Sequence, residues 1–244
     1  MTALPHNPET CSRPGPQAAL DELEALFRLD DEEAGELLLV RHARPAFRPD
    51  GEQPADALLS CEGLEQAERL ADRLSDLWVD AIYSSPERRT FQTARIVADG
   101  LGRPLHILDA LAEIEFEPAS LIPDYASRFA LLPRWQSLPG FEDGPTFRRR
   151  VIQAIEGVIA RHSARRVVVV THSSVINAYL SMLLGVSRDL FFAPDHASIS
   201  AVRHQNDTYA LRYLNDTSHL SGTCWNGSFN AAFTAVNKSL NQAS

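Results

Sequence analysis

The sequence has few cysteines, no excess of positive charge and no long apolar run, and each shortage excludes a class of protein. Its 3 cysteines lie far apart in the 244 residues and show none of the spacings of a zinc site, so neither a disulfide framework nor structural zinc is indicated. The net charge of -9 disfavours nucleic acid and anionic membrane surfaces as partners, because the mean field of the chain would repel both.

The sequence also shows no membrane-spanning segment, no secretory signal and no glycine-rich nucleotide-binding motif. No apolar run approaches the roughly 18 residues of a membrane-spanning helix, and the N-terminus has neither the basic nor the apolar part of a secretory signal. The glycine-rich motifs G-x-x-x-x-G-K-S/T and G-x-G-x-x-G are absent as well. We therefore expect a cytoplasmic protein with no nucleic acid and no membrane as partner, and any anion that it binds must meet a local cluster of cations.

Composition divides the chain into a central region and flanking segments. Residues 1–17 hold four of the fifteen prolines and predict a disordered tail. Residues 18–35 carry leucines at helical spacing, which predicts a peripheral amphipathic helix. We expect the catalytic domain over residues 36–214. Residues 215–244 are rich in Asn, Ser, Thr and Ala without a clear period, and they predict a C-terminal extension outside the core.

Strand and helix patterns alternate within the central region. Short apolar runs predict strands, and apolar residues three or four positions apart predict helices. Strands are expected at 36–41, 80–85, 104–111 and 165–171, helices at 60–78, 86–102, 146–162 and 172–185, a hairpin at 197–215, and an excursion of short helices at 117–142. This alternation predicts an α/β fold, a three-layer α/β/α sandwich with a mostly parallel central sheet and an antiparallel edge strand.

Two of the expected strands are intensely apolar and end directly in a histidine, the first at His42 and the second at His172. Because the carboxyl ends of parallel strands meet at one edge of a sheet, both imidazoles should face one site. Two further strand ends add charged residues: Arg88, Arg89, Glu113 and Glu115. Guanidinium groups match phosphoryl oxygens in pairs, and histidine is the nucleophile of this set that can attack phosphorus. The sequence therefore predicts a site for a phosphate ester, with a carboxylic acid to protonate the leaving group.

Five segments, in order along most of the chain, resemble the histidine phosphatase (phosphoglycerate mutase-like) superfamily, and its phosphatase branch in particular. They are "VRHARP", "LSCEGLEQAERLADRL", "YSSPERRTFQTA", "LAEIEFE" and "VVVVTHSSVI". The resemblance implies that His42 is the nucleophile that becomes phosphohistidine. It implies that Arg41, Arg89 and His172 hold the phosphoryl group, and it places Glu113 at the position of the proton donor.

The chain departs from the usual segments of this superfamily beside both histidines. The residues that differ are Ala43, Arg44, Pro45, Ser173 and Ser174, where a glycine, an acid or amide, a threonine and two glycines are common. The methyl group of Ala43 is expected to tighten the loop where the backbone approaches the ligand. Arg44 adds a cation at the mouth of the site, and we expect both Arg44 and Ser173 to contact the substrate.

These features predict a metal-independent phosphomonoester hydrolase that works through a phosphohistidine on a small phosphorylated metabolite, with no cofactor and no metal ion. A phosphoglycerate-type mutase is the nearest alternative; mutases of this kind carry a longer insertion before the second histidine, whereas Glu113 and His172 are only 59 positions apart (172 minus 113). A binding or regulatory protein that has lost turnover, and a biosynthetic enzyme with a specialised substrate, also stay open. The expected partner is a small phosphate ester, and a homodimer is left open. The remaining histidines have no partners visible in the sequence, and we expect them to have no role in the site. Among them His196 is the one to check, because its segment resembles the start of a late strand of the superfamily that passes near the site.

Overall fold

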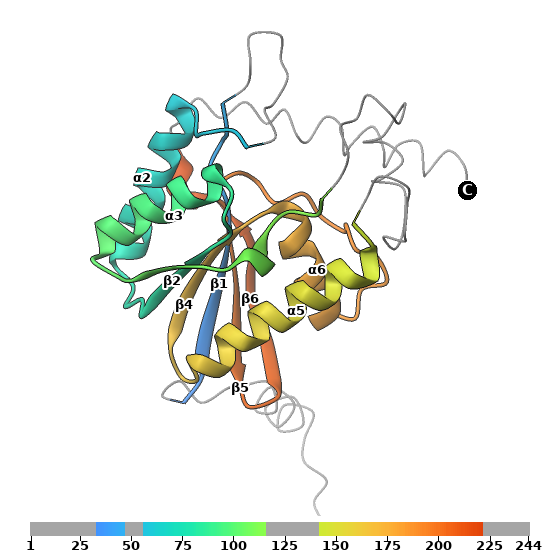
Figure 1. Cartoon of the computed structure of the whole chain (residues 1–244). Helices are drawn as coiled ribbons and strands as arrows, with labels where there is room; N and C mark the ends of the chain where they lie inside the picture. The colour runs from blue at the N-terminus through green and yellow to red at the C-terminus, as the bar shows by residue number, and fades with distance from the viewer. Residues whose placement is uncertain (1–32, 47–55, 116–141, 222–244) are drawn as a thin grey trace, which may run out of the picture.

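A six-stranded mixed sheet forms the centre of the computed structural model, which describes residues 33–46, 56–115 and 142–221 (Figure 1). The strands lie in the order β3-β2-β4-β1-β5-β6. Four of them are mutually parallel, and β5 pairs antiparallel with β1 on one side and with β6 on the other. Their bounds are β1 (Gly35–Arg41), β2 (Ala81–Ser84), β3 (Leu105–Ile107), β4 (Arg166–Thr171), β5 (Ile199–Gln205) and β6 (Thr208–Asp216).

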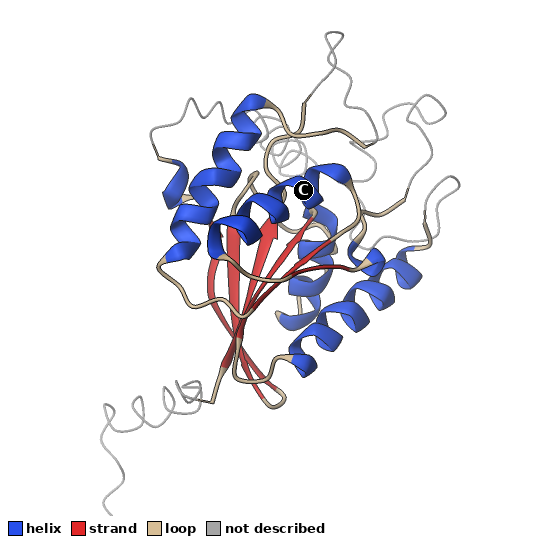
Figure 2. Cartoon of the chain, turned by 60° about the vertical axis from the view of Figure 1, so that its left-hand side comes forward, coloured by secondary structure: helices blue, strands red, loops and turns tan. Residues whose placement is uncertain are grey.

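Helices cover both faces of this sheet (Figures 1 and 2). Helices α2 and α3 pack on one face, and α5 and α6 pack on the other. The bounds are α2 (Cys61–Ser75), α3 (Arg88–Leu101), α5 (Gly144–Arg161) and α6 (Ser173–Leu183), with short 3-10 helices η1 (Asp109–Leu111) and η3 (Ser218–Leu220). The predicted three-layer sandwich, with a mostly parallel sheet and an antiparallel edge, is confirmed.

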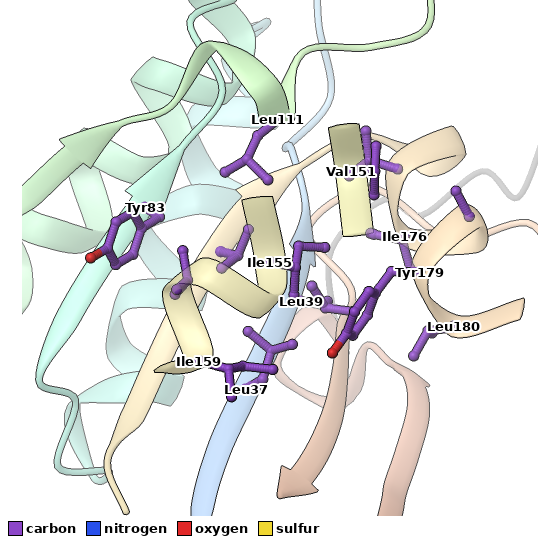
Figure 3. Packing of buried hydrophobic residues seen from close by; sticks show 14 of the residues in the cluster. Leu37, Leu39, Tyr83, Leu111, Val151, Ile155, Ile159, Ile176, Tyr179 and Leu180 are labelled. Carbon is purple, nitrogen blue, oxygen red and sulfur yellow. The ribbon is translucent and has the colours of Figure 1, made fainter. Parts of the chain in front are cut away.

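Strand β1 lies inside the sheet, and all seven of its residues are buried. Leu37 and Leu39 point to the face that α5 and α6 cover, where Figure 3 shows them beside Tyr179 of α6. Leu38 and Val40 point to the opposite face and pack against α2 and α3. An uninterrupted apolar run is thus needed here, because successive side chains of a strand alternate between two buried faces.

The helix ends are set by ordinary capping groups. The Ser60 side chain accepts the N–H of Gly63 at 3.0 Å at the start of α2, and Asp143 accepts the N–H of Thr146 at 3.0 Å at the start of α5. Helix α3 ends at Gly102, whose φ of 61° is the left-handed conformation that glycine adopts without strain. These caps fix where each helix starts or stops relative to the strand that it follows or precedes.

Most of the observed helices and strands start and end within three residues of the expected positions, and two differences concern the fold. Strand β3 covers three residues rather than the expected 104–111, because it pairs only with the short strand β2 and the chain then turns into η1. Strand β6 continues past residue 214, and η3 follows it. Leu220 of η3 is 4% exposed and packs in a small cluster with Ala43 and Ala67, so this part of the expected extension belongs to the core.

Several expectations fall on residues that the structure does not describe. The tail over 1–17 lies outside the described residues, and so do the excursion over 117–142 except its last residue and most of the extension over 215–244. The helix expected over 18–35 lies outside them up to residue 32, and its last residue, Gly35, already belongs to β1. Of the helices in the described ranges, none is both long and apolar enough to cross a membrane.

Candidate active site

The carboxyl edge of the parallel strands, at the top of Figure 1, brings the two histidines together. Strands β1 and β4 pair with Arg41 opposite Thr171, so the residues that follow, His42 and His172, are neighbours. The backbone N–H of His42 donates to the carbonyl of Thr171 at 2.9 Å, and the two ring centroids lie 5.3 Å apart. The register of the two strands therefore fixes the spacing of the two imidazoles.

His42 is buried, and its hydrogen bonds define its tautomer. Its Nδ1 lies 2.8 Å from the carbonyl oxygen of Ala43, which can only accept, so Nδ1 carries the proton. Its Nε2 accepts a hydrogen bond from Nε of Arg89 at 3.3 Å and therefore holds a lone pair. Burial, followed by the neighbouring His172 and Arg41, lowers the pKa of His42 well below its usual value. At neutral pH the imidazole is thus uncharged with its lone pair on Nε2, which is the state that a nucleophile needs.

Arg89 links the two histidines. Its guanidinium is buried and, besides its bond to His42, donates from Nη2 to Nδ1 of His172 at 3.2 Å. The adjacent Arg88 is exposed, and its backbone N–H donates to the side chain of Asp56. Of the two arginines at the start of α3, the structure therefore brings Arg89 to the histidines and leaves Arg88 at the surface.

Arg41, at the end of β1, is buried with its charge intact. Its Nη1 donates to the carbonyl of Pro194 at 2.6 Å. Burial lowers the pKa of the guanidinium to about 10, while the carboxylates of Glu113 and Asp195 act in the opposite direction. Arg41 is therefore protonated at neutral pH, and both carboxylates lie within its electrostatic reach.

Glu113 follows η1 and is partly exposed, and its backbone is held by two side chains. Its N–H donates to Oε1 of Glu87 at 2.9 Å, and its carbonyl accepts from Nη2 of Arg150 at 3.1 Å. One of its carboxylate oxygens accepts the N–H of Ile114 at 2.9 Å. The segment is not a strand, so Glu115 does not share a strand face with Glu113; it is exposed.

Three of the residues that depart from the superfamily segments differ in exposure and in the groups that they contact. The guanidinium of Arg44 pairs with the carboxylate of Glu62 at 3.3 Å and is partly exposed. Ser173 is the first residue of α6, directly after the second histidine. Ala43 is fully buried in the cluster that contains Leu220, a neighbour that the sequence did not suggest.

Three residues of α2 and α3 hold the backbone that follows the first histidine, a role that was not predicted for them from the sequence. Oγ1 of Thr93 accepts the N–H of Ala43 at 3.0 Å, and Oε1 of Gln66 accepts the N–H of Arg44 at 2.9 Å. Gly63 lies so close to Arg44 that an added Cβ would stand 2.0 Å from the carbonyl oxygen of that residue. All three belong to the segments that carry the resemblance, which is the signal that could have identified them.

His172 is fully buried, and it contacts a carboxylate that the sequence analysis also missed. Its Nε2 lies 2.8 Å from Oγ of Ser85 and 3.1 Å from Oε2 of Glu87. Because Arg89 can only donate to Nδ1, the ring proton is on Nε2, which donates to this pair. The two histidines thus hold their protons on different nitrogens, Nδ1 in His42 and Nε2 in His172.

His196 lies beside His42, and the centroids of the two rings are 5.4 Å apart. Burial and the nearby guanidinium groups of Arg41, Arg44 and Arg89 lower its pKa to about 2. Within the described residues its ring makes no hydrogen bond. The imidazole of His196 is therefore neutral, although it lies among the positive charges of the site.

The edge as a whole suits a phosphoryl dianion. Helices α3 and α6 begin directly after β2 and β4, so the positive ends of their dipoles add to the charges of Arg41 and Arg89. In the described ranges no group of three His, Cys, Asp or Glu side chains is placed to hold a metal ion. Buried arginines around a neutral histidine suit one class of protein, an α/β enzyme that acts on phosphate groups.

Comparison with known proteins gives the family. The profile of the histidine phosphatase superfamily (branch 1) matches residues 37–217, and the chain belongs to this family. Phosphoserine phosphatase 1 of Hydrogenobacter thermophilus is 33% identical over 197 residues, which cover 75% of this chain and 93% of that protein. The metal-independent phosphoserine phosphatase of Arabidopsis thaliana is 27% identical over 208 residues, 78% of this chain and 85% of that protein. The structure of Bacillus stearothermophilus YhfR has a TM-score of 0.68 at 22% identity and covers 77% of this chain and 100% of its own.

These matches confirm the superfamily, the fold and the class of enzyme, a phosphatase, that the sequence predicted.

Proposed function

We propose that the chain hydrolyses small phosphate monoesters through a covalent phosphohistidine at His42. The observation that carries the proposal is the protonation state of His42: its Nδ1–H is tied to a backbone carbonyl, and its Nε2 lone pair stands beside the guanidinium of Arg89. A phosphoryl group held by Arg41, Arg89 and His172 would present its phosphorus to this neutral nitrogen.

In the first step the Nε2 lone pair of His42 forms a bond to phosphorus while the bond between phosphorus and the ester oxygen breaks. Glu113, as the protonated acid, gives its proton to the departing oxygen. Arg41 and Arg89 stabilise the charge on the nonbridging oxygens. The carbonyl of Ala43, which accepts Nδ1–H, stabilises the positive charge that the ring acquires. The products are the free alcohol and phosphohistidine.

In the second step water attacks the phosphohistidine. The carboxylate of Glu113 takes a proton from the water as its oxygen bonds to phosphorus and the bond from phosphorus to Nε2 breaks. Inorganic phosphate leaves, and both Glu113 and His42 return to their starting protonation states. No step requires a metal ion or a cofactor.

The names of the relatives support a small substrate such as phosphoserine. The relative at 33% identity is a phosphoserine phosphatase, and a second is a metal-independent phosphoserine phosphatase. We assign substrate contacts to Arg44 and Ser173, because each follows one of the two histidines. A mutase is disfavoured by the 59 positions between Glu113 and His172 (172 minus 113), which leave little room for an insertion that would shield the phosphoenzyme.

The test is release of inorganic phosphate by the full chain from phosphoserine, 3-phosphoglycerate and p-nitrophenyl phosphate, measured with malachite green before and after dialysis against EDTA. We expect release that EDTA leaves unchanged, a fall of about a thousandfold or more in His42→Ala, and a base-stable phosphoenzyme by mass spectrometry in the wild type alone. His106→Ala is the matched control, because His106 is exposed on β3, and it should keep its rate within about twofold. Retained turnover in His42→Ala would overturn the proposal, and a positional isomer in place of phosphate would indicate a mutase.

A further inference from the structure

Glu87 stands immediately before α3, at the N-cap position that Ser, Thr, Asp or Asn ordinarily occupies. Its carboxylate makes no capping hydrogen bond to that helix. It is instead directed to the end of β4 and to the segment after η1, where its side chain is 20% exposed. The carboxylate therefore has a use other than starting α3.

Both oxygens of this carboxylate accept hydrogen bonds from groups of the site. Oε2 accepts from Oγ of Ser85 at 2.5 Å and lies 3.1 Å from Nε2 of His172, while Oε1 accepts the backbone N–H of Glu113 at 2.9 Å. These bonds hold the pKa of Glu87 below its usual range although burial alone would raise it. Glu87 is thus an anion that joins the second histidine to the backbone of the proposed proton donor.

Few other charged or titratable groups face His172. Arg89, also from the start of α3, donates to its Nδ1, and His42 from the end of β1 lies beside its ring. Both groups occupy or approach the side of the ring that should meet the phosphoryl group. Nδ1 can donate to a phosphoryl oxygen only when it too carries a proton. The anion at Nε2 is therefore the group that can fix the first ring proton there and compensate the positive charge of the doubly protonated ring when a phosphoryl dianion binds.

We propose that Glu87 is a positioning residue of the phosphatase reaction, which holds His172 in the Nε2–H tautomer and fixes the backbone of Glu113. This inference rests on the proposed function for its effect on turnover, whereas its effect on the His172 ring is independent of it. Carboxylates that orient metal-ligating histidines are typically worth about 10- to 100-fold, or about 1.4–2.7 kcal/mol, and we expect an effect of the same order at His172.

The substitution Glu87→Gln tests the proposal, because both carboxylate oxygens act as acceptors. An amide has one oxygen and one NH₂ group, so in this variant an NH₂ group must face either the N–H of Glu113 or the Nε2–H of His172. We expect kcat for p-nitrophenyl phosphate to fall about 10- to 100-fold, with KM changed less than about threefold. Glu87→Asp keeps the charge and should recover part of the loss.

Two measurements separate positioning from a purely structural role. In chains labelled with ¹⁵N-histidine, NMR reports which ring nitrogen of His172 is protonated, and His172→Asn identifies its signals. We expect one tautomer, protonated at Nε2, in the wild type. In Glu87→Gln we expect a second population protonated at Nδ1, because an NH₂ group that faces Nε2 disfavours a proton there and competes with the donation of Arg89 to Nδ1. Urea unfolding gives the stability of each variant, and Glu65→Gln is the matched control, because Glu65 is an exposed carboxylate of α2 that pairs with Arg69.

A Glu87→Gln variant with the wild-type tautomer, or with kcat within twofold of the wild type, would overturn the proposal, and so would a loss of stability with neither change. If the wild type proves inactive towards every phosphate ester, the proposed function fails, but the tautomer of His172 in Glu87→Gln still decides whether Glu87 positions the ring.

Discussion

The substitution Gly63→Ala should damage the enzyme, although it replaces a helical glycine by the best helix former. At an open helical position this change stabilises a protein by about 0.5–1 kcal/mol. At Gly63, however, the new Cβ would lie 2.0 Å from the carbonyl oxygen of Arg44 and 3.0 Å from the carbonyl carbon. Both are backbone atoms, so no side-chain rotation can relieve the overlap.

The size of the effect follows from this overlap. The backbone must shift by about 1 Å to bring the Cβ to even 3.0 Å from the oxygen, the lower limit of real contacts. Overpacking of this kind costs about 1–3 kcal/mol, of which the helix propensity of alanine returns up to about 1 kcal/mol. Arg44 lies two residues after His42, whose Nδ1 is tied to the carbonyl of Ala43, so the nucleophile moves too. A misplacement of about 1 Å costs on the order of 100-fold in rate.

The assay combines urea unfolding with kcat at saturating p-nitrophenyl phosphate. Gly157→Ala is the matched control, because Gly157 lies within α5 and an added Cβ would meet nothing within 4 Å. We expect Gly157→Ala to gain about 0.5–1 kcal/mol of stability at unchanged kcat, and Gly63→Ala to lose both stability and rate. A Gly63→Ala protein as stable and as active as the wild type would refute the view that close packing of α2 on this loop sets the position of the nucleophile.

Two further predictions concern the same region. Thr93→Val leaves the N–H of Ala43 without its acceptor, so urea unfolding should show a loss of about 1–3 kcal/mol; Thr93→Ser keeps the hydroxyl, and equal losses in both variants would contradict this explanation. The free energy of unfolding should also fall as pH drops from 7 to 5, because His42 and His196 stay neutral in the folded chain but bind protons near pH 6.5 when it unfolds. His196→Gln removes one of these protons, so its stability should depend less steeply on pH, and an unchanged slope would count against the low pKa of His196.

The fold could be predicted from the sequence because its central strands β1, β2 and β4 are buried on both faces, and because α2, α3 and α5 each bury one face. Uninterrupted apolar runs and three- or four-residue spacing are direct consequences of that burial. The errors lie where partners far along the chain decide the outcome. Strand β3 is short because its partner β2 offers three residues, and Leu220 is buried because Ala43 and Ala67 happen to lie beside it.

The same distinction applies to the site. His42, His172 and Arg89 could be found because each lies at or just beyond a strand end, where parallel strands gather ligands. Glu87 lies in one of the segments that carry the resemblance, but its proposed role could not be predicted, because it depends on the ring of His172, 85 positions further along (172 minus 87). The cytoplasmic location and a homodimer stay predictions of the sequence.

The pairing of β1 with β4 has a consequence for how this chain can change through mutation. Because His42 and His172 follow strands whose register is locked, a slip of one residue would turn His42 to the opposite face of the sheet. The distance between the two histidine rings is thus set by backbone hydrogen bonds at the centre of the protein. Substitutions at Arg44 and Ser173, which lie three and two positions beyond the ends of β1 and β4, leave this register unchanged. If both residues contact the substrate as proposed, such substitutions change the choice of alcohol without moving the two histidines.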